Sequence, residues 1–530
     1  MPTANREDNR EDLWGFFGQD GYKLSPNLTL NLGLRYSCFG PFSSKDGNLS
    51  TVVLGTGSSM FTGLGMRIGG NMYTAQRANL SPEFGFAWSP RQNNGNLVIR
   101  GGFGMNYDEE EIAIAANGIN NPPNVVSPSY SSASPSNINP DIVYSVASDV
   151  HSLFGYPANP NTIVSFNTNH LPTKGVVGVT GFPANLPTMY TYHYSLGTQY
   201  SFGGNWIASL GYQGSTARHI ITQYNANVLG AAYGYPLNPA VDSVDFYNNE
   251  GNSNYNAMLA DLRHSFSRQF LADVSYTWAK SMDDGSQPYY EDPYPYNPRL
   301  AWGRSDFNVQ NAVKIYGLWQ PVIFHGAHGW LEKVVGGWSL SGILNLHTGF
   351  PWTPTYTNIP SGSLYYQGSG YGTLRPAAYL GGAGRNTDNK TFESGGAASS
   401  YNRNYSNGAL SYFTVSSFTP AIAAFPATFP PPQTPGVARN SLNGPNYRDL
   451  DGTLTKSFGL PKMRVLGESA RIEVRADVFN FFNTLNLNVS SINKVISNDG
   501  VTSNPTFGQV QSPNAALGSR LVDLQARFSF

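Results

Sequence analysis

The sequence predicts an all-β protein whose antiparallel sheet crosses a membrane as a β-barrel. Three observations predict this fold. Apolar and polar residues alternate along many segments, short turns flanked by large apolar residues recur, and the chain ends on Phe530 within an alternating segment. Successive side chains of a strand point to opposite faces, so each such segment has one apolar face and one polar face. An apolar face toward lipid and a polar face toward an aqueous lumen are typical of transmembrane barrels.

Composition favours this fold over a soluble enzyme. Of the 530 residues, 12% are charged and 13% are aromatic, and the chain has 57 Gly and 36 Pro. Soluble proteins have about 25% charged residues. The 32 basic and 33 acidic residues give no excess of positive charge, which argues against a nucleic-acid partner. Cys38 is the single cysteine, which excludes an intramolecular disulfide and a multi-cysteine metal site.

The hydropathy pattern agrees with strands rather than with membrane helices. No segment reaches the roughly 18–20 continuous apolar residues of a membrane helix, and the mean hydropathy is -0.30. Residues 1–12 are polar and charged and show no apolar secretion signal. We therefore expect residues 1–12 to be a disordered or truncated N-terminus. Residues 13–530 are expected to form the C-terminal part of a barrel that lacks its N-terminal domain.

The predicted strands are joined in a regular way. The turns at residues 25–27, 89–96, 203–205 and 267–269 are flanked by large apolar, often aromatic, residues, as at one rim of a membrane barrel. Long segments rich in Gly, Pro, Ser and Asn lie between these hairpins and are expected to be outer loops: 37–76, 108–188, 216–252, 281–305, 350–445 and 483–518. Loops of this length count against a soluble domain. We count about thirteen strands, and because complete bacterial barrels normally have an even number, N-terminal strands are expected to be missing.

Several segments together resemble the TonB-dependent outer-membrane receptors, in particular Oar-like members with a carboxypeptidase-regulatory-like N-terminal domain. The similar segments are 16–20, 28–36, 276–284, 305–310, 337–342 and 471–483, together with Phe530. The resemblance implies a barrel of about 22 strands in the bacterial outer membrane, which takes up a solute with energy from the TonB complex. The family's signal peptide, TonB box and plug domain are not recognisable here, so TonB is expected to act only through a missing N-terminal plug.

The end of the chain is expected to carry a signal for the barrel-assembly machinery. Leu524, Phe528 and Phe530 share the apolar face of the last strand, where outer-membrane lipid is the expected partner. Residues 470–478 show the same alternation, with four charges on the other face: Arg471, Glu473, Arg475 and Asp477. A strand with four charges on one face is not buried on both sides. These charges are expected to face the lumen as a cross-strand ion-pair ladder, or else as a polar wall that contacts a plug or a solute.

One loop is the main ligand candidate. It carries four acidic side chains and four tyrosines: Asp283, Asp284, Tyr289, Tyr290, Glu291, Asp292, Tyr294 and Tyr296. Carboxylates suit a hard cation, and tyrosines suit a sugar or an aromatic ligand. The alternative is an outer loop whose tyrosines pack on neighbouring loops. A second acidic run, Asp108, Glu109 and Glu110, could bind calcium or simply be hydrated. No other cofactor is expected.

Catalytic motifs are incomplete, and we expect no enzymatic activity. The segment Gly337–Ser341 lacks the final glycine of a nucleophile elbow, and Gly63–Ile68 lacks the third glycine of a dinucleotide fingerprint. The predicted function is a receptor that takes up an unidentified solute (a siderophore, a carbohydrate or an oligomer) through its outer loops. The first alternative is a structural or adhesive barrel that binds glycans or cell surfaces without transport. The second is a soluble all-β glycan-binding protein.

Overall fold

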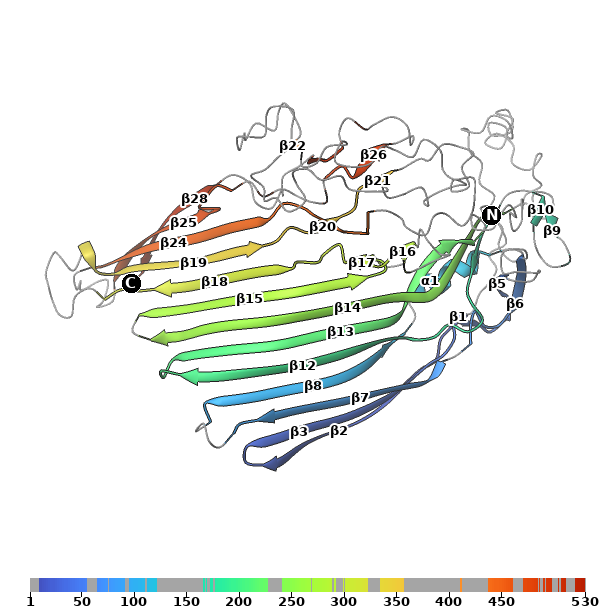
Figure 1. Ribbon diagram of the computed structural model, residues 1–530, viewed down its shortest axis with the longest axis horizontal. Coiled ribbons are helices and arrows are strands. Elements are labelled where there is room, and N and C mark those ends of the chain that lie inside the picture. Colours follow the sequence, from blue (N-terminus) through green and yellow to red (C-terminus); the bar gives the residue numbers. More distant parts are fainter. Residues whose placement is uncertain are drawn as a thin grey trace.

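The computed structural model consists mainly of one large sheet, whose strands lie side by side in chain order (Figure 1). It describes residues 9–54, 64–74, 76–90, 95–109, 112–121, 165–166, 168, 172–174, 177–226, 241–267, 269–287, 290–291, 299, 301–322, 334–356, 410–411, 437–460, 470–484, 486, 490, 492–497, 504, 507–510 and 520–529. Among these residues, no helix is long and apolar enough to cross a membrane.

Thirteen long strands form most of the 18-stranded sheet within the described residues, in agreement with the count of about thirteen from the sequence. They are β2 (Leu13–Ser25), β3 (Leu28–Phe39), β7 (Gln76–Trp88), β8 (Leu97–Asp108), β12 (Met189–Phe202), β13 (Trp206–Asn225), β14 (Val241–Ser267), β15 (Phe270–Asp283), β18 (Asn311–Trp319), β19 (Trp338–His347), β24 (Tyr447–Gly459), β25 (Arg471–Phe479) and β28 (Leu521–Ser529). Each pairs antiparallel with the next one in this order. The predicted antiparallel, all-β fold is confirmed.

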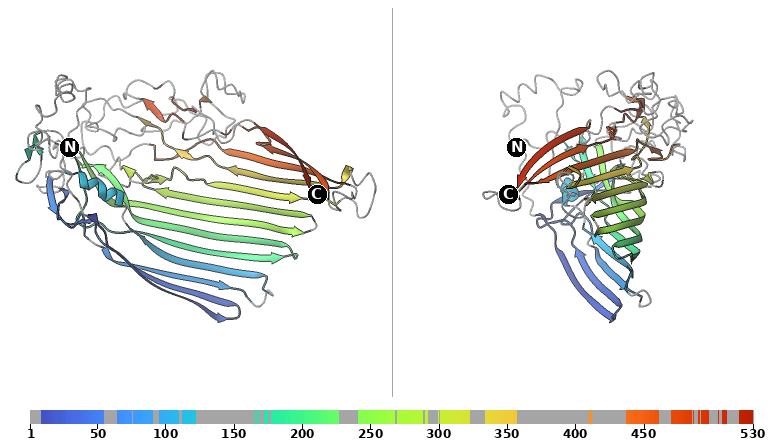
Figure 2. Two further views of the ribbon diagram at one scale, coloured as in Figure 1. Left: turned by 180° about the vertical axis from the view of Figure 1, so that it is seen from behind. Right: turned by 90° about the vertical axis from the view of Figure 1, so that its left-hand side faces the viewer.

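The sheet is curved, and β2 and β28 lie at its two edges (Figure 2). No pairing joins β2 to β28 among the described residues. The side chains of β2 are exposed along almost its whole length, because only one side of this strand has a neighbour. The described sheet is therefore the curved wall of a barrel, with two open edges.

The register keeps apolar side chains on one face of the sheet and polar ones on the other. Leu32 lies opposite Phe84, which lies opposite Phe103 and then Tyr194. One residue along each strand, the row is Gly33, Glu83, Gly104 and His193. Because the apolar row is exposed, with Leu32 at 50%, it is the surface that meets lipid. We call the other surface the inner face.

Aromatic residues gather where the short turns join the strands. The Phe202 and Trp206 rings stack across the 203–205 turn with centroids 6.3 Å apart, and Trp206 lies 4.6 Å from the His264 ring. Lys456 lies among other aromatic residues of this rim, and its Nζ is 5.1 Å from the ring centroids of both Trp338 and Phe458. A lysine stem along apolar surface with its ammonium at the polar boundary is the expected behaviour at a membrane interface. This rim matches the predicted aromatic girdle.

The opposite rim is more ordered than the sequence predicts. β5 (Leu49–Leu54) pairs with β6 (Leu64–Gly69) and, in parallel, with β11 (Val177–Gly181), which pairs in parallel with the start of β14. With α1 (Ile112–Asn117) these strands form what we call the outer cap. They enclose a hydrophobic core of buried residues: Phe42, Leu49, Met72, Tyr73, Ala115, Phe182, Leu186 and Tyr247. Parts of the 37–76, 108–188 and 216–252 segments are therefore packed structure rather than open loop.

A buried amide joins the strands of the outer cap. Asn121, 2% exposed, donates from Nδ2 to the carbonyl oxygens of Ser50 and Thr180, and its Oδ1 accepts from the Thr180 N–H. These bonds satisfy the polar atoms of a side chain that is removed from water, which would otherwise destabilise the cap.

Short elements complete the loop rim. They are β1 (Asn9–Arg10), β4 (Ser43–Ser44), η2 (Gly118–Asn120), β9 (Ser165–Phe166), β10 (Pro172–Lys174), β16 (Tyr290–Glu291), β17 (Gly303–Arg304), β20 (Pro351–Trp352), β21 (Thr355–Tyr356), β22 (Leu410–Ser411), β23 (Leu442–Asn443), β26 (Val495–Ser497) and β27 (Gln509–Val510). β1 falls within residues 1–12, where a disordered or truncated N-terminus is expected, and pairs with β4.

Candidate functional site

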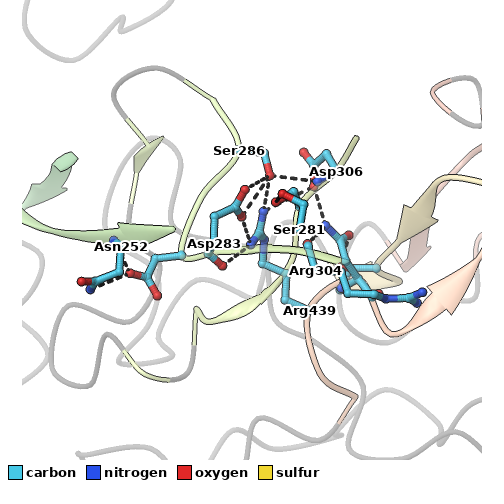
Figure 3. Close-up of polar contacts among 11 residues, drawn as sticks. Asn252, Ser281, Asp283, Ser286, Arg304, Asp306 and Arg439 are labelled. Atoms are coloured by element: carbon cyan, nitrogen blue, oxygen red, sulfur yellow. Dashed lines mark hydrogen bonds and ion pairs between the residues drawn. The ribbon is translucent and has the colours of Figure 1, made fainter. Parts of the chain in front are cut away.

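A polar cluster at the loop rim contains the first acidic residue of the predicted ligand loop (Figure 3). Asp283 ends β15, and its side chain is only 5% exposed. Arg439 donates from Nη1 to Asp283 Oδ1 at 2.6 Å and from Nη2 to Ser286 Oγ at 2.8 Å. Ser286 Oγ also donates to the Asp283 carboxylate at 2.8 Å. The Asp283 carboxylate is thus occupied by the protein itself.

The same cluster extends to β17 and to the residues before β23. Asn440 donates from Nδ2 to Asp306 Oδ1 at 2.5 Å and to the Arg304 carbonyl oxygen at 2.7 Å. Arg304 donates from Nε to the Asn440 carbonyl oxygen at 2.6 Å. Ser281 and Ser305 share a hydrogen bond of 2.8 Å between their hydroxyls. These contacts clasp two parts of the chain that are more than 130 residues apart.

Asp284, the next residue, contacts β14. Its Oδ2 accepts from the Asn252 backbone N–H at 2.7 Å and from Asn252 Nδ2 at 3.1 Å. Burial raises the pKa of the Asp284 carboxyl above its ordinary value, and the two bonds from Asn252 only partly oppose this effect. Asp284 is therefore a buried hydrogen-bond acceptor in the wall of the rim.

The other predicted members of the loop are only partly described. Tyr290 and Glu291 form β16, which pairs in parallel with Thr222 and Gln223 of β13. Tyr289, Asp292, Tyr294 and Tyr296 lie outside the described residues. The structure therefore places Asp283 and Asp284 in hydrogen-bonded contacts between segments of the rim. The role of the four tyrosines and of the remaining acids in ligand binding stays a prediction.

Sequence patterns do not reveal the partners of Asp283. Arg439 stands in a segment rich in proline and small residues, 156 residues from Asp283. Asp306 belongs to a segment that resembles the receptor family, but this resemblance gives no partner. A charge far along the chain can be matched to a buried carboxylate only when the fold is known.

The second acidic run lies near another carboxylate. Asp108 ends β8 and is exposed, as is Glu109, whereas Glu110 lies outside the described residues. Burial, and then the charge of Glu109, raise the pKa of Glu11. No group of three or more His, Cys, Asp or Glu residues within the described part of the chain is arranged to hold a metal ion. Calcium at Asp108, Glu109 and Glu110 thus remains a prediction without a geometric site.

The four charges of β25 share the inner face, as the alternation predicts, but they pair differently. Asp477, 4% exposed, accepts from Thr453 Oγ1 at 2.6 Å and from Arg475 Nε at 2.8 Å. This ion pair runs along one strand, instead of across strands as expected. Glu473 lies opposite Arg527 and Arg471 opposite Ser529 in the register, but neither Arg471 nor Glu473 forms an ion pair among the described residues.

The inner face has two adjoining hollows over strands β2, β3, β7, β8, β12, β13 and β14. Their volumes are about 510 and 530 Å³, and both are lined by Asn31, Ser195 and Gln213. Glycines lie between the polar residues: Gly85 and Gly102 line both hollows. Because a glycine has no side chain, the wall is recessed at these positions. We call the two hollows together the wall groove.

The last strand presents its apolar face outward. Leu524 is 76% exposed and Phe528 is 46% exposed, and both share a face with Val522 and Ala526. Phe530 lies outside the described residues. The exposure agrees with contact to lipid, and the proposed recognition by the assembly machinery stays a prediction.

Together, a curved antiparallel sheet, a lipid-facing apolar surface, an aromatic rim and a polar inner wall define an outer-membrane β-barrel. The model of the outer membrane beta barrel domain family matches residues 1–523, and the chain belongs to this family. Among the curated proteins, no sequence matches significantly.

Several solved structures are similar to this chain at low identity. They include the outer membrane transporter YddB from Escherichia coli (11% identity, TM-score 0.44, 98% of this chain and 54% of that chain), the FrpB iron transporter from Neisseria meningitidis (10%, 0.42, 99% and 46%) and the ferric preacinetobactin receptor BauA from Acinetobacter baumannii (9%, 0.40, 98% and 43%). The chain thus spans about half the length of these proteins.

Proposed function

We propose that this chain forms the wall of an outer-membrane receptor that takes up a solute through the barrel lumen. The observation that carries the proposal is the inner face, which combines a recessed polar groove with a rim that is clasped by buried polar contacts. Such a wall offers a water-filled path lined with hydrogen-bonding groups, whereas the apolar face holds the protein in lipid. The joint resemblance of its segments to TonB-dependent receptors supports active uptake, with TonB acting through a plug domain.

A second candidate is a barrel that binds glycans or cell surfaces without transport. The outer cap favours it, because a packed core with fully buried Met72 and Val52 makes a firm surface at the loop rim. Both candidates place ligand contact outside the cell, and they differ in whether anything crosses the membrane. Catalysis is not part of either proposal.

Deleting the gene and comparing what the cells consume distinguishes the two candidates. Wild-type and deleted strains grow in the same complex medium, and mass spectrometry quantifies the solutes that remain. A transporter predicts that at least one solute stays in the medium of the deleted strain, and that a protonophore has the same effect on the wild type. Identical consumption by both strains contradicts transport, and reduced attachment to glycan-coated surfaces then supports the adhesive barrel.

A further inference from the structure

We propose that the wall groove is a binding site for a neutral, hydroxyl-rich solute such as an oligosaccharide. This inference rests on the proposed function, because it names the class of solute that crosses the barrel. Each hollow lies within the range of about 300–1,000 Å³ that is usual for small-molecule sites. The groove lies across the middle of β12, far from both rims, so a solute in it is already inside the lumen.

The polar side chains of the groove have no partners within the described protein. They share the inner face and are exposed, and no hydrogen bond or ion pair of their side chains is found among the described residues: Gln19, Asn31, Glu83, His193, Ser195 and Gln213. Elsewhere on the inner face, some polar groups are paired with one another. There Asp477 is paired with Arg475 and Thr453, and Tyr316 donates to Asp273 at 2.9 Å. The polar side chains of the groove therefore have free hydrogen-bonding capacity.

The chemistry of these groups matches hydroxyls. Amides, a hydroxyl and an imidazole both donate and accept hydrogen bonds, as does each hydroxyl of a sugar. A ring can approach the wall closely at Gly85 and Gly102, where no side chain projects. Hydroxyl-bearing ligands use such sites selectively, because an analogue without hydroxyls leaves the polar groups of the site unpaired.

The charges of the groove argue for a neutral solute. The first hollow contains the carboxylate of Glu83, and the second contains the guanidinium of Arg100, which donates to Gln199 Oε1 at 2.9 Å. The groove therefore has no net charge. An anionic iron chelate would lie near Glu83, with its one possible counter-charge already engaged by Gln199, so the inference favours a carbohydrate over such a chelate.

Neighbouring residues of β12 provide a matched pair of variants. Ser195 lines both hollows from the inner face. Leu196 also borders the second hollow, but its side chain points to the opposite face of the strand and is 54% exposed toward lipid. Ser195→Trp fills the groove with a large ring, and Leu196→Trp places the same ring toward lipid, where tryptophan is tolerated. Each variant replaces the chromosomal copy, and blotting of outer membranes confirms equal amounts of protein.

In the consumption experiment, we expect the Ser195→Trp strain to leave the same solute as the deleted strain, and that solute to be neutral and hydroxyl-rich. The Leu196→Trp strain should consume it like the wild type. Wild-type consumption by the Ser195→Trp strain overturns the inference, as does a charged solute left by the deleted strain. Both of those results leave uptake itself intact, whereas identical consumption by the deleted strain and the wild type removes the proposed function.

Binding measured in vitro gives an independent readout. Maltotriose is titrated by calorimetry into the intact protein extracted from outer membranes in detergent, with citrate as an anionic control. Ser195→Trp should lower the affinity for maltotriose by at least about tenfold, Leu196→Trp by less than about twofold, and citrate should not bind. Equal maltotriose affinity in both variants, or a Ser195→Trp protein that only fails to fold, assigns the groove to packing against protein and overturns the inference. Absence of maltotriose binding to the wild type overturns it as well.

Discussion

At the scale of single residues, Asp283 and Arg439 set the stability of the loop rim. The Asp283 carboxylate is 5% exposed and the Arg439 side chain is 13% exposed, so neither is well solvated. Arg439→Met leaves a buried carboxylate without its counter-charge and should destabilise the rim by about 3–5 kcal/mol. Hydrogen exchange of peptides that cover residues 281–287 and 437–443 measures this opening. Adding Asp283→Asn to Arg439→Met should restore most of the protection, and a double variant as labile as the single one would contradict the pairing.

Asp284 makes the stability of the rim depend on pH, and this residue stabilises the rim more at low pH than at neutral pH. Burial raises the pKa of its carboxyl above the ordinary 3.8, so the folded rim holds the proton more tightly than the unfolded chain does. The stabilisation is complete below pH 3.8 and is lost as the pH rises through the raised pKa. Asp284→Asn keeps an oxygen acceptor for Asn252 and stays neutral. Its stability advantage over the wild type should therefore be absent at low pH and grow toward neutral pH in urea unfolding series.

Val474 and Arg475 test which face of β25 meets lipid. Val474 is 42% exposed on the apolar face, and it lies opposite Lys456. Val474→Arg places a charge toward hydrocarbon close to the aromatic rim, opposite the like charge of Lys456, and should destabilise the barrel by about 1–2 kcal/mol, less than a charge at the midplane. Arg475→Ala removes a half-exposed arginine, while the nearly buried Asp477 carboxylate keeps its hydrogen bond from Thr453 Oγ1, so its effect should be smaller than that of Val474→Arg. Equal losses on refolding into lipid vesicles would contradict the assignment of the faces.

At the scale of elements, the outer cap should respond to changes in its core. Phe182 is 2% exposed, and its ring stacks on Tyr247 with centroids 5.4 Å apart. Phe182→Ala should destabilise the cap by about 3–5 kcal/mol and speed up hydrogen exchange in β5 and β11, while β12 and β13 stay protected. Phe17→Ala serves as the control, because Phe17 is 81% exposed. Unchanged exchange in the Phe182→Ala cap would show that this core does not hold the strands together.

The strands could be predicted from the sequence because their signal is local. Alternation in residues 28–36 or 470–478 fixes both the strand and its two faces within a few residues, and the short turns fix the register of each hairpin. The outer cap could not be predicted in this way. β11 pairs in parallel with β5 and β14, which lie far away in the chain, and α1 has only six residues. Those contacts form only when distant segments meet.

The candidate sites likewise combine features that local sequence patterns predict with features that depend on contacts between distant segments. The sequence identifies Asp283 and Asp284 as notable acids, but their roles depend on Arg439 and Asn252, which no local pattern connects to them. The wall groove was not predicted at all. Its residues come from seven strands, and each of them appears in the sequence as an ordinary position of an alternating segment. A groove of this kind exists only after the register has aligned them.

At the scale of the whole molecule, the direction of the strands constrains how the wall can close. Thirteen antiparallel strands in the described residues place β2 and β28 at the edges, and an odd number makes both run in the same direction. An antiparallel contact between these two edges is therefore impossible within one copy of the sheet. Exposed strand edges carry unpaired N–H and C=O groups, which are not tolerated next to hydrocarbon. A direct contact between β28 and β2 would have to be parallel, and we expect additional antiparallel strand structure to separate them in the membrane instead.

Cysteine cross-linking in cells tests this separation. In a Cys38→Ser background, Gly18→Cys and Leu34→Cys occupy directly opposed positions of β2 and β3 and should cross-link on oxidation. Gly18→Cys with Leu524→Cys combines the two edge strands on the same apolar face and should stay reduced, because other strands lie between them. Mobility in electrophoresis without reductant distinguishes the two results. Efficient cross-linking of positions 18 and 524 would show that β2 and β28 are neighbours and would contradict the open edges of the sheet.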